Sequence, residues 1–585
     1  MSKMRFITKR YFGLSIFLAC GLGAFAQPFA GIDDLGRVLP QNKETGSPKA
    51  NRQVGLFYFL WQGHQGSPTS ERVWDLTKLQ MEAPAVFEDF DHPGWGGGAG
   101  RPGKYYFWGE SIYGYYRGDD YWVHLKNIQL LTDAGVDFLV LDATNRITYT
   151  HEVDVLMQAT EAVRKQGKQP PKIVFYTNTK SGEGMQEIYD NHYKDGAPYR
   201  NPECWYYLEG KPLIIGISEQ AAGKDYEHFF TIRESQWPNE PEKVDGWPWI
   251  EFQRPQKVYT NHKGKKEIVN VSAAQHPNLD ASMGGSAFYG ADGNWGRSYR
   301  NGSPGNPETD ILYGYNIQEQ WDFALKQNVP FVFITGWNEW IAGKWRRTSG
   351  NQNHALFVDQ ANSEYSRDIE PAWTSGLRDT YYMQMVSNIR RYKGTEKVRA
   401  NKVSKRKIAS WSDWDKINAC YVDYVGDILH RNHPGAQSEP KVIYDNQTGR
   451  NDFDTLKVAA STSSLHFYVS TVNDITEVSG DDWMTLWLNI DQSYQSGWNG
   501  FDFRVVQGNR LEQYTDGSWK RVGEVTYRVA GNRLMLEIPL KSLGLRSAGD
   551  IEFKWSDNMQ QADPIDWYIN GDAAPGGRFT VWAKF

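Results

Sequence analysis

The 585-residue sequence contains only three cysteines, and they lie far apart in the chain, so no disulfide framework is encoded. No cysteines and histidines have the spacing of a zinc site. A glycine-rich phosphate loop, a nucleophile elbow, and haem and flavin signatures are all missing. We therefore expect domains that are held together by packing, and no organic cofactor.

An excess of basic charge is missing too. The sequence has 64 Lys and Arg against 70 Asp and Glu, a net charge of −6, so nothing in it indicates a nucleic-acid partner. Beyond the N-terminal region no run is long and apolar enough to span a membrane. We expect a monomer with no transmembrane segment.

Residues 1–26 have the pattern of an export signal. A basic region, Lys3–Arg10, precedes an apolar run that ends in the small-x-small site Ala24–Ala26. Cleavage there removes four of the 64 basic residues and no acidic one, leaving 60 against 70 and a net charge of about −10. Attachment of lipid to Cys20 is the alternative, although Phe17–Ala19 fits a lipid-attachment box poorly. The sequence predicts a secreted or periplasmic protein.

The chain is too long for a single core, so at least two domains are expected. In residues 27–395, near-continuous apolar runs alternate with helical periodicity, which is typical of a parallel sheet covered by helices. The fold class predicted is α/β, a (β/α)₈ TIM-type barrel, with an open doubly wound sheet as the alternative. The predicted strands are 54–60, 137–142, 172–177, 211–217, 249–252, 268–271, 329–335 and 355–358, and the predicted helices are 153–165, 317–326 and 377–392.

The pattern changes after the barrel. Residues 396–409 are basic and poor in apolar side chains, which predicts a solvated linker. Residues 410–585 contain short alternating strands separated by turn signals, which predicts an all-β sandwich domain. Its expected strands are 465–469, 484–490, 501–505, 533–538 and 551–555.

The end of the strand at 329–335 carries the most informative motif. The apolar run breaks at Gly336 and is followed by Asn338, Glu339 and Trp340. The C-terminal ends of barrel strands carry the active residues of this fold. A carboxylate can move a proton, an amide can bind a hydroxyl, and an indole can stack on a sugar ring, so this motif predicts a sugar-cleaving site.

Glycoside hydrolysis usually needs two carboxyl groups. Asp142, at the end of the second predicted strand, is the first candidate partner of Glu339, and Glu251 is the second. Asp142 could instead cap or orient a loop, and the alternation around Glu251 could point its side chain either into the barrel or at the helices. Further substrate-binding candidates lie at other strand ends: Trp61, Gln62, His64, Tyr176, Asn178 and His276. No catalytic metal is predicted.

Three segments carry a resemblance to glycoside hydrolase families 71 and 99, which include endo-α-mannosidases. Thr335–Trp340 is similar to their strand-end motif, and 118–145 and 364–371 are similar to other parts of this group. The resemblance implies a (β/α)₈ barrel that acts on carbohydrate. In family 99 a second glutamate follows three residues after the first, and Ala342 stands there in this sequence, so the usual acid/base residue is absent from its place.

The C-terminal domain resembles family 9 carbohydrate-binding modules, notably at 445–454, 483–487 and 497–503. Trp498, among Gly and Asn residues, is the candidate sugar platform, whereas Trp487 is expected in the core. Asp445, Asp452 and Asp454 could hold a structural Ca²⁺ or could be exposed turn acids.

Together these features predict a secreted glycoside hydrolase that cleaves a poly- or oligosaccharide. A glycan-binding protein without catalysis, and a polysaccharide lyase that uses Tyr or His as its base, are the alternatives. The sugar, the linkage and the stereochemical outcome are left open.

Overall fold

The computed structural model describes residues 29–63, 75–95, 104–277, 293–346, 355–358, 360–399, 403–404, 408–436 and 442–585. The predicted export signal, including Cys20, and the candidate His64 lie outside these residues. None of the helices within these ranges is both long and apolar enough to cross a membrane.

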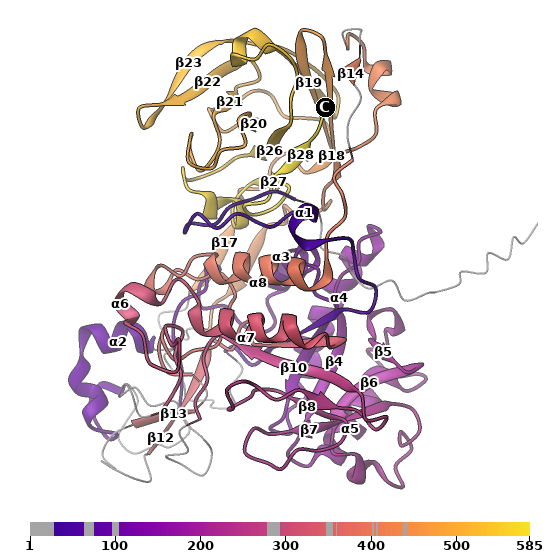
Figure 1. Cartoon of the computed structure of the whole chain (residues 1–585), viewed down its shortest axis with the longest axis vertical. Coiled ribbons are helices and arrows are strands. Elements are labelled where there is room, and N and C mark those ends of the chain that lie inside the picture. The colour runs from indigo at the N-terminus through magenta and orange to yellow at the C-terminus, as the bar shows by residue number, and fades with distance from the viewer. Residues whose placement is uncertain are drawn as a thin grey trace, which may run out of the picture.

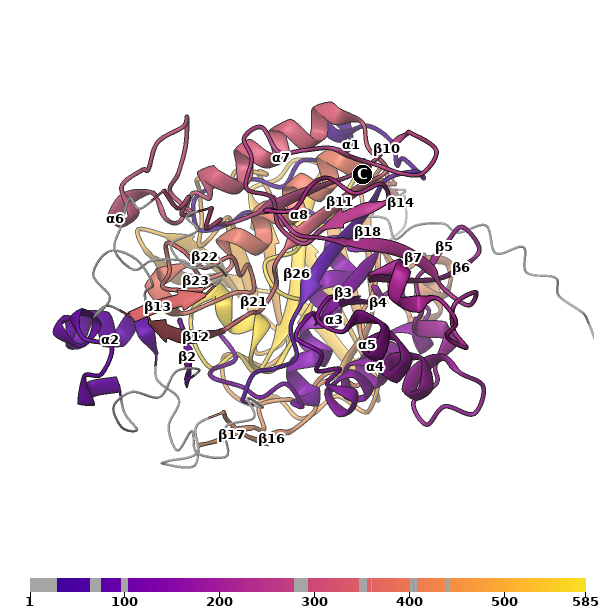
Figure 2. The same ribbon diagram turned by 90° about the horizontal axis from the view of Figure 1, so that it is seen from below.

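A sheet of mainly parallel strands forms the core of the first part of the chain (Figure 2). Strand β1 (Gln53–Tyr58) lies at its centre and pairs in parallel with β11 (Phe331–Thr335) on one side and β3 (Phe138–Ala143) on the other. Beyond β3 the order continues with β4 (Lys172–Thr177), β6 (Lys211–Gly216), β7 (Thr231–Gln236) and β8 (Gly246–Pro248), and beyond β11 it continues with β10 (Lys266–Ser272). Strands β8 and β10 contact each other, so the sheet is a nearly closed barrel.

Helices follow several of these strands and cover the barrel. Helix α3 begins at Asp120, whose side chain accepts hydrogen bonds from two backbone amides of its first turn, and ends at Gly135, which has a left-handed φ of 81°. The three predicted helices are confirmed, with small shifts of their ends. The helices around the barrel are α3 (Tyr121–Ala134), α4 (Thr150–Lys165), α5 (Ser181–Ile188), α7 (Tyr315–Gln327) and α8 (Thr380–Lys393).

The strand assignment needs two corrections. Residues 249–252 are not a strand, and the fifth and sixth barrel strands are β7 and β8. Strand β7 lacks the apolar run that identified the other barrel strands. A charged residue of this strand, Arg233, is buried because it pairs with Glu267 at 2.9 Å. In consequence β11 is the eighth strand of the barrel, where the seventh was predicted.

The second correction concerns the predicted eighth strand. Residues 355–358 form β13 (Ala355–Val358), which pairs antiparallel with β12 (Ile341–Arg346) outside the barrel. Strand β2 (Lys104–Phe107) completes this three-stranded sheet. Figure 2 shows the sheet to one side of the barrel strands. Because β12 starts directly after the Asn338–Trp340 motif, this small sheet borders the candidate site.

The C-terminal part of the chain contains two large, mainly antiparallel sheets, which lie beyond α8 from the barrel (Figure 1). All five strands predicted there are present. At the turn between β22 (Arg510–Thr515) and β23 (Ser518–Glu524), Asp516 and Gly517 both have positive φ, as a tight hairpin requires. The first sheet contains β14 (Val403–Ser404), β15 (Tyr421–Val422), β18 (Phe453–Ser461), β19 (Ser464–Thr471), β24 (Thr526–Ala530) and β25 (Arg533–Pro539). The second contains β20 (Thr485–Asn489), β21 (Phe503–Val506), β22, β23, β26 (Ile551–Asp557), β27 (Asp572–Ala574) and β28 (Val581–Ala583).

Buried charges join the two parts of the molecule. Arg431, on β16 (Arg431–Pro434), contacts Asp120 at the start of α3 at 2.7 Å, and both side chains are buried. Arg578 contacts Asp379 at the start of α8 at 2.7 Å. Part of the predicted linker also belongs to the C-terminal structure, because β14 pairs with β18. The two parts therefore share an extensive buried boundary.

Candidate active site

The candidate site is built around Glu339, just beyond the end of β11. Its Oε2 accepts hydrogen bonds from Arg367 Nη2 at 2.5 Å and from Gln360 Nε2 at 2.9 Å. Its backbone amide donates to the carboxylate of Asp368. Glu339 is only 5% exposed. Its carboxylate is thus held in one position by a buried guanidinium and an amide.

Arg367 brings further groups to this carboxylate. Its guanidinium lies 4.9 Å from the centre of the Trp249 ring, and its Nη1 lies 3.4 Å from His276 Nδ1. His276 in turn packs its ring 5.0 Å from that of Phe252. The structure therefore gathers two of the predicted residues, Glu339 and His276, around Arg367.

A second buried carboxylate lies behind the motif. Glu370 accepts hydrogen bonds from Tyr116 Oη at 2.9 Å, from Asn127 Nδ2 at 2.7 Å and from the indole of Trp340. Burial raises the pKa of Glu370 to about 7. Trp340 has no exposed surface and stacks on Trp108 with 4.7 Å between ring centres. Its indole belongs to the core in this structure, and its contact with a substrate stays a prediction.

Hydrogen bonds of Asn338 and Gln62 hold the segment 338–340 against the end of β1. The Asn338 side chain accepts a hydrogen bond from Phe59 N at 2.9 Å and donates to Tyr116 Oη at 3.0 Å, and it is fully buried. Gln62 donates to the Asn338 carbonyl oxygen. Trp61 is half-buried and packs against the ring of Tyr105 at 5.6 Å. The positions of these residues explain how the loop is held, while their direct contacts with a substrate stay predictions.

Asp142 lies at the end of β3, half-buried, and its Oδ1 accepts a hydrogen bond from Thr144 N at 2.9 Å. Only β1 separates β3 from β11 in the sheet. Adjacent strands lie about 4.8 Å apart, so the ends of β3 and β11 are about 10 Å apart. Asp142 therefore lies at the same barrel face as the end of β11 that precedes Glu339, and β11, as the eighth strand, is one strand nearer to β3 than predicted.

Glu251 has a structural set of contacts. It is fully buried, and its Oε1 accepts hydrogen bonds from the backbone amides of Phe252 at 2.8 Å and Gln253 at 3.0 Å. Its Oε2 accepts one from Tyr259 Oη at 3.0 Å. Burial raises the pKa of this carboxyl above its usual value. The carboxylate orders its own loop, and its catalytic role stays a prediction.

Tyr176 and Asn178 lie at and just beyond the end of β4. The Tyr176 hydroxyl is buried and donates to Trp247 O at 2.8 Å, whereas Asn178 is half-buried and accepts from Ser235 Oγ at 2.9 Å. Both face the same end of the barrel as Asp142, since β3 and β4 are parallel neighbours.

Four residues of the site were not predicted from the sequence: Gln360, Arg367, Asp368 and Glu370. They lie between β13 and α8, far along the chain from the motif that they contact. The segment 364–371 was noted only for its resemblance to a family. The signal that was available is the run Arg367–Glu370, which contains three charged residues directly before Pro371.

The C-terminal candidate Trp498 belongs to a group of four tryptophans. It stacks on Trp487 with 4.9 Å between ring centres, and the ring of Trp567 lies 5.7 Å away. Trp519 packs edge-on against Trp487 at 5.8 Å. As expected, Trp487 is buried, while Trp498 is half-buried. The group presents part of its aromatic surface to solvent.

The three aspartates suggested for calcium do not gather. Asp445 is exposed and pairs with His430 at 2.5 Å, and Asp454 accepts a hydrogen bond from Ser470 Oγ at 3.0 Å. Asp452 lies instead with Asp427 and Asp572.

No family model and no curated protein matches this chain. Among solved structures, a GH99 endo-α-mannosidase from Bacteroides thetaiotaomicron is similar over 58% of this chain and 96% of its own, at 15% identity and a TM-score of 0.33. A glycoside hydrolase-like protein matches 59% of this chain and 95% of its own, at 10% identity and a TM-score of 0.29. An α-L-fucosidase isoenzyme 1 from Paenibacillus thiaminolyticus covers 83% of this chain and 97% of its own, at 9% identity and a TM-score of 0.20. The first of these structures is of a family 99 protein, the family that the motifs resemble.

Proposed function

We propose that this chain is an exported glycoside hydrolase that cleaves a glycosidic bond in a poly- or oligosaccharide. The observation that carries the proposal is the Glu339 carboxylate, held by Arg367 and Gln360 at the end of a barrel strand. A carboxylate that is held in one position at that end of a barrel is suited to acid/base catalysis. A catalytic group can transfer a proton only if it lies within hydrogen-bond reach of the reacting atom.

In this proposal Glu339 acts as base, as nucleophile, or by removing a proton from a neighbouring sugar hydroxyl. Asp142, at the end of β3, supplies the partner carboxyl group. It suits this role better than Glu251, since Asp142 is half-buried and Glu251 is fully buried with both oxygens hydrogen-bonded. His276 binds a substrate hydroxyl beside Arg367.

The test uses purified full-length protein, a panel of polysaccharides and an assay for new reducing ends. Glu339→Gln is expected to lower the rate at least about 100-fold, because it removes a group that transfers a proton or forms a bond in the transition state. Glu219→Gln is the matched control, since Glu219 is an exposed glutamate just after β6. Equal rates for the wild type and Glu339→Gln, on a substrate that the wild type cleaves, would refute the assignment.

A glycan-binding protein without catalysis is the second candidate. Two observations favour it: Ala342 is a buried apolar residue where a second carboxylate was expected, and the four tryptophans form an aromatic surface. Binding of a polysaccharide without new reducing ends, unchanged in Glu339→Gln, would establish this candidate. Products that absorb as unsaturated uronates would indicate a lyase instead.

We propose that the C-terminal sheets form a carbohydrate-binding sandwich with Trp498 as its platform. The half-buried indole stacked on a buried one is a rigid flat surface of the kind that packs on a pyranose ring.

A further inference from the structure

Three aspartates from separate segments meet at the boundary between the barrel and the C-terminal sheets. Asp427 lies between β15 and β16, Asp452 directly precedes β18, and Asp572 begins β27. One carboxylate oxygen from each lies within 4.8 Å of the other two. Oxygens that bind one Ca²⁺ lie about 2.4 Å from it, so two ligands are at most about 4.8 Å apart. The three carboxylates therefore have the spacing of one coordination sphere.

A separate observation points to a missing partner. All three aspartates are more than nine-tenths buried. Oδ1 of Asp427 and Oδ1 of Asp452 have no hydrogen-bond donor, although buried carboxylate oxygens are normally satisfied. Asp423, which is also buried, has an unpartnered Oδ2 and lines the same cavity as Asp427 and Asp572.

The protein cations Lys126 and Lys554 balance the charge of the three carboxylates only in part. Within the described ranges, one ion pair involves these three carboxylates: Lys126 Nζ lies 3.4 Å from Asp427 Oδ2. Lys554 lies near enough to act on Asp423 and Asp572, but its ammonium group donates to the carbonyl oxygens of Pro575 and Phe579. Burial, together with the charges of Asp427 and Asp423, holds the pKa of Asp572 well above its usual value. A bound cation would remove this repulsion.

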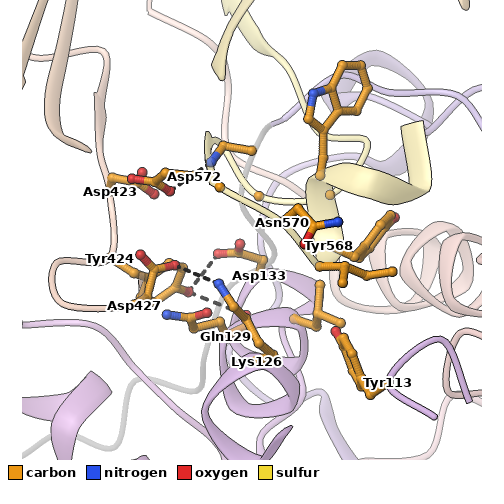
Figure 3. Close-up of a pocket in the computed structure, with 17 residues that line it drawn as sticks. Tyr113, Lys126, Gln129, Asp133, Asp423, Tyr424, Asp427, Tyr568, Asn570 and Asp572 are labelled. Atoms are coloured by element: carbon orange, nitrogen blue, oxygen red, sulfur yellow. Dashed lines mark hydrogen bonds and ion pairs between the residues drawn. The ribbon is translucent and has the colours of Figure 1, made fainter. Parts of the chain in front are cut away.

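The cavity at this place has a volume of about 30 Å³ and lies between α3 and the C-terminal sheets (Figure 3). This is room for an ion or a water molecule. Figure 3 shows Lys126, Gln129 and Asp133 of α3 on one side, and Asp423 and Asp572 on the other. An ion here would thus lie at the boundary that joins the two parts of the chain.

We propose that Asp427, Asp452 and Asp572 bind one Ca²⁺ ion, and that the ion holds the C-terminal sheets against the barrel. An all-oxygen set of carboxylates is typical of Ca²⁺, whose flexible geometry tolerates ligands from separate segments. This site is independent of the carboxylates at the mouth of the barrel, and its test does not depend on catalysis.

The experiment uses full-length protein that has been freed of metal and dialysed. Mass spectrometry of the metal content after dialysis against Ca²⁺ is expected to give about one calcium per chain, and calorimetric titration is expected to show one saturable site. Adding EDTA to the calcium-loaded protein should lower its Tm by at least about 5 °C, because an ion bound only to the folded state stabilises it. Mg²⁺ should bind at least about tenfold more weakly.

Asp452→Asn is the test variant and Asp445→Asn the control, since Asp445 is an exposed aspartate of the same part of the chain. Asp452→Asn should weaken Ca²⁺ binding at least about tenfold and make the Tm insensitive to EDTA, while Asp445→Asn should behave as the wild type. No saturable Ca²⁺ binding by the wild type, or equal affinity for Mg²⁺, would overturn the proposal. The proposal would also be overturned if the Tm of Asp452→Asn equalled or exceeded the Tm of the wild type both in the presence of calcium and in the presence of EDTA.

Discussion

Arg367 donates a hydrogen bond of 2.5 Å to Oε2 of Glu339, and both side chains are almost completely buried. Removal of one partner of a buried ion pair leaves the other charge buried and uncompensated. The free energy of unfolding then falls by far more than the intact pair contributes to it. Arg367 therefore both positions the candidate catalytic carboxylate and makes its burial possible.

Replacement of Arg367 by Met should destabilise the protein by about 3–5 kcal/mol, because the buried Glu339 carboxylate then loses the guanidinium that donates to it. Denaturant unfolding followed by tryptophan fluorescence measures the change. The double variant Arg367→Met/Glu339→Gln should recover part of the loss, since no uncompensated charge remains. Arg346→Met is the control, because Arg346 forms a half-exposed ion pair with Asp91. Strictly additive effects of the two single changes would contradict the coupling.

Glu370 should make stability depend on pH. Burial raises the pKa of Glu370 in the folded state to about 7, above the usual glutamate value of 4.5, so the folded state holds the proton more tightly than the unfolded state. The contribution is fully present below pH 4.5 and is lost as the pH rises through 7. It amounts to about 3 kcal/mol, at about 1.4 kcal/mol per pKa unit.

The Tm of Glu370→Gln, relative to that of the wild type, should accordingly rise between pH 5 and pH 8, because the amide cannot lose a proton. Calorimetry across this range measures the difference. The exposed-site variant Glu219→Gln should show a difference from the wild type that does not change with pH. A flat difference for Glu370→Gln as well would show that the carboxyl does not titrate in this range.

The sequence predicted the elements whose signals are local. Strands such as β4 carry uninterrupted apolar runs, and α4 has helical periodicity, so both were found with nearly correct ends. Strand β7 was missed because Arg233 is buried through an ion pair with Glu267, 34 residues further along the chain. The pattern of side chains within one segment does not reveal an ion-pair partner that lies in a distant segment.

The same limit applies to the candidate site. Glu339 was identified because a strand end and a motif coincide at one place in the sequence. Arg367 lies 28 residues further on, and its role follows only from the fold that brings it to the carboxylate. Likewise Asp452 was named as a possible calcium ligand, but its neighbours Asp427 and Asp572 come from segments that the sequence did not connect with it.

Trp498 should carry glycan binding by the C-terminal sheets. Trp498→Ala is expected to weaken retention of full-length protein by an immobilised polysaccharide at least about tenfold, because a stacking aromatic surface is lost. Affinity electrophoresis measures this retention. Trp373→Ala is the control, since Trp373 is a 40% exposed tryptophan on the barrel part of the chain. Equal retention of the two variants would place the binding surface elsewhere.

The ion pair between Arg431 and Asp120 should make the two parts of the chain depend on each other. Arg431 Nε and Nη2 donate to Asp120 Oδ2 at 2.9 and 2.7 Å, while Oδ1 of the same carboxylate accepts from the first turn of α3. Without the guanidinium, the buried carboxylate at the start of α3 loses its cation on the side that faces the C-terminal sheets.

Arg431→Ala should therefore cost about 3–5 kcal/mol of stability and should separate barrel unfolding from C-terminal unfolding in a calorimetric scan. Arg521→Ala, in an exposed ion pair with Glu524 on the β23 strand, should change stability by no more than about 0.5 kcal/mol. If Arg431→Ala still unfolds in one transition at the wild-type temperature, the boundary does not depend on this pair. Arg431 contacts Asp120 and Tyr113 and is not part of the hydrogen bonds that hold Glu339. Hydrolysis measured well below the first transition should therefore stay within about twofold of the wild type, as expected for a residue that joins two domains and not for one that acts in the active site.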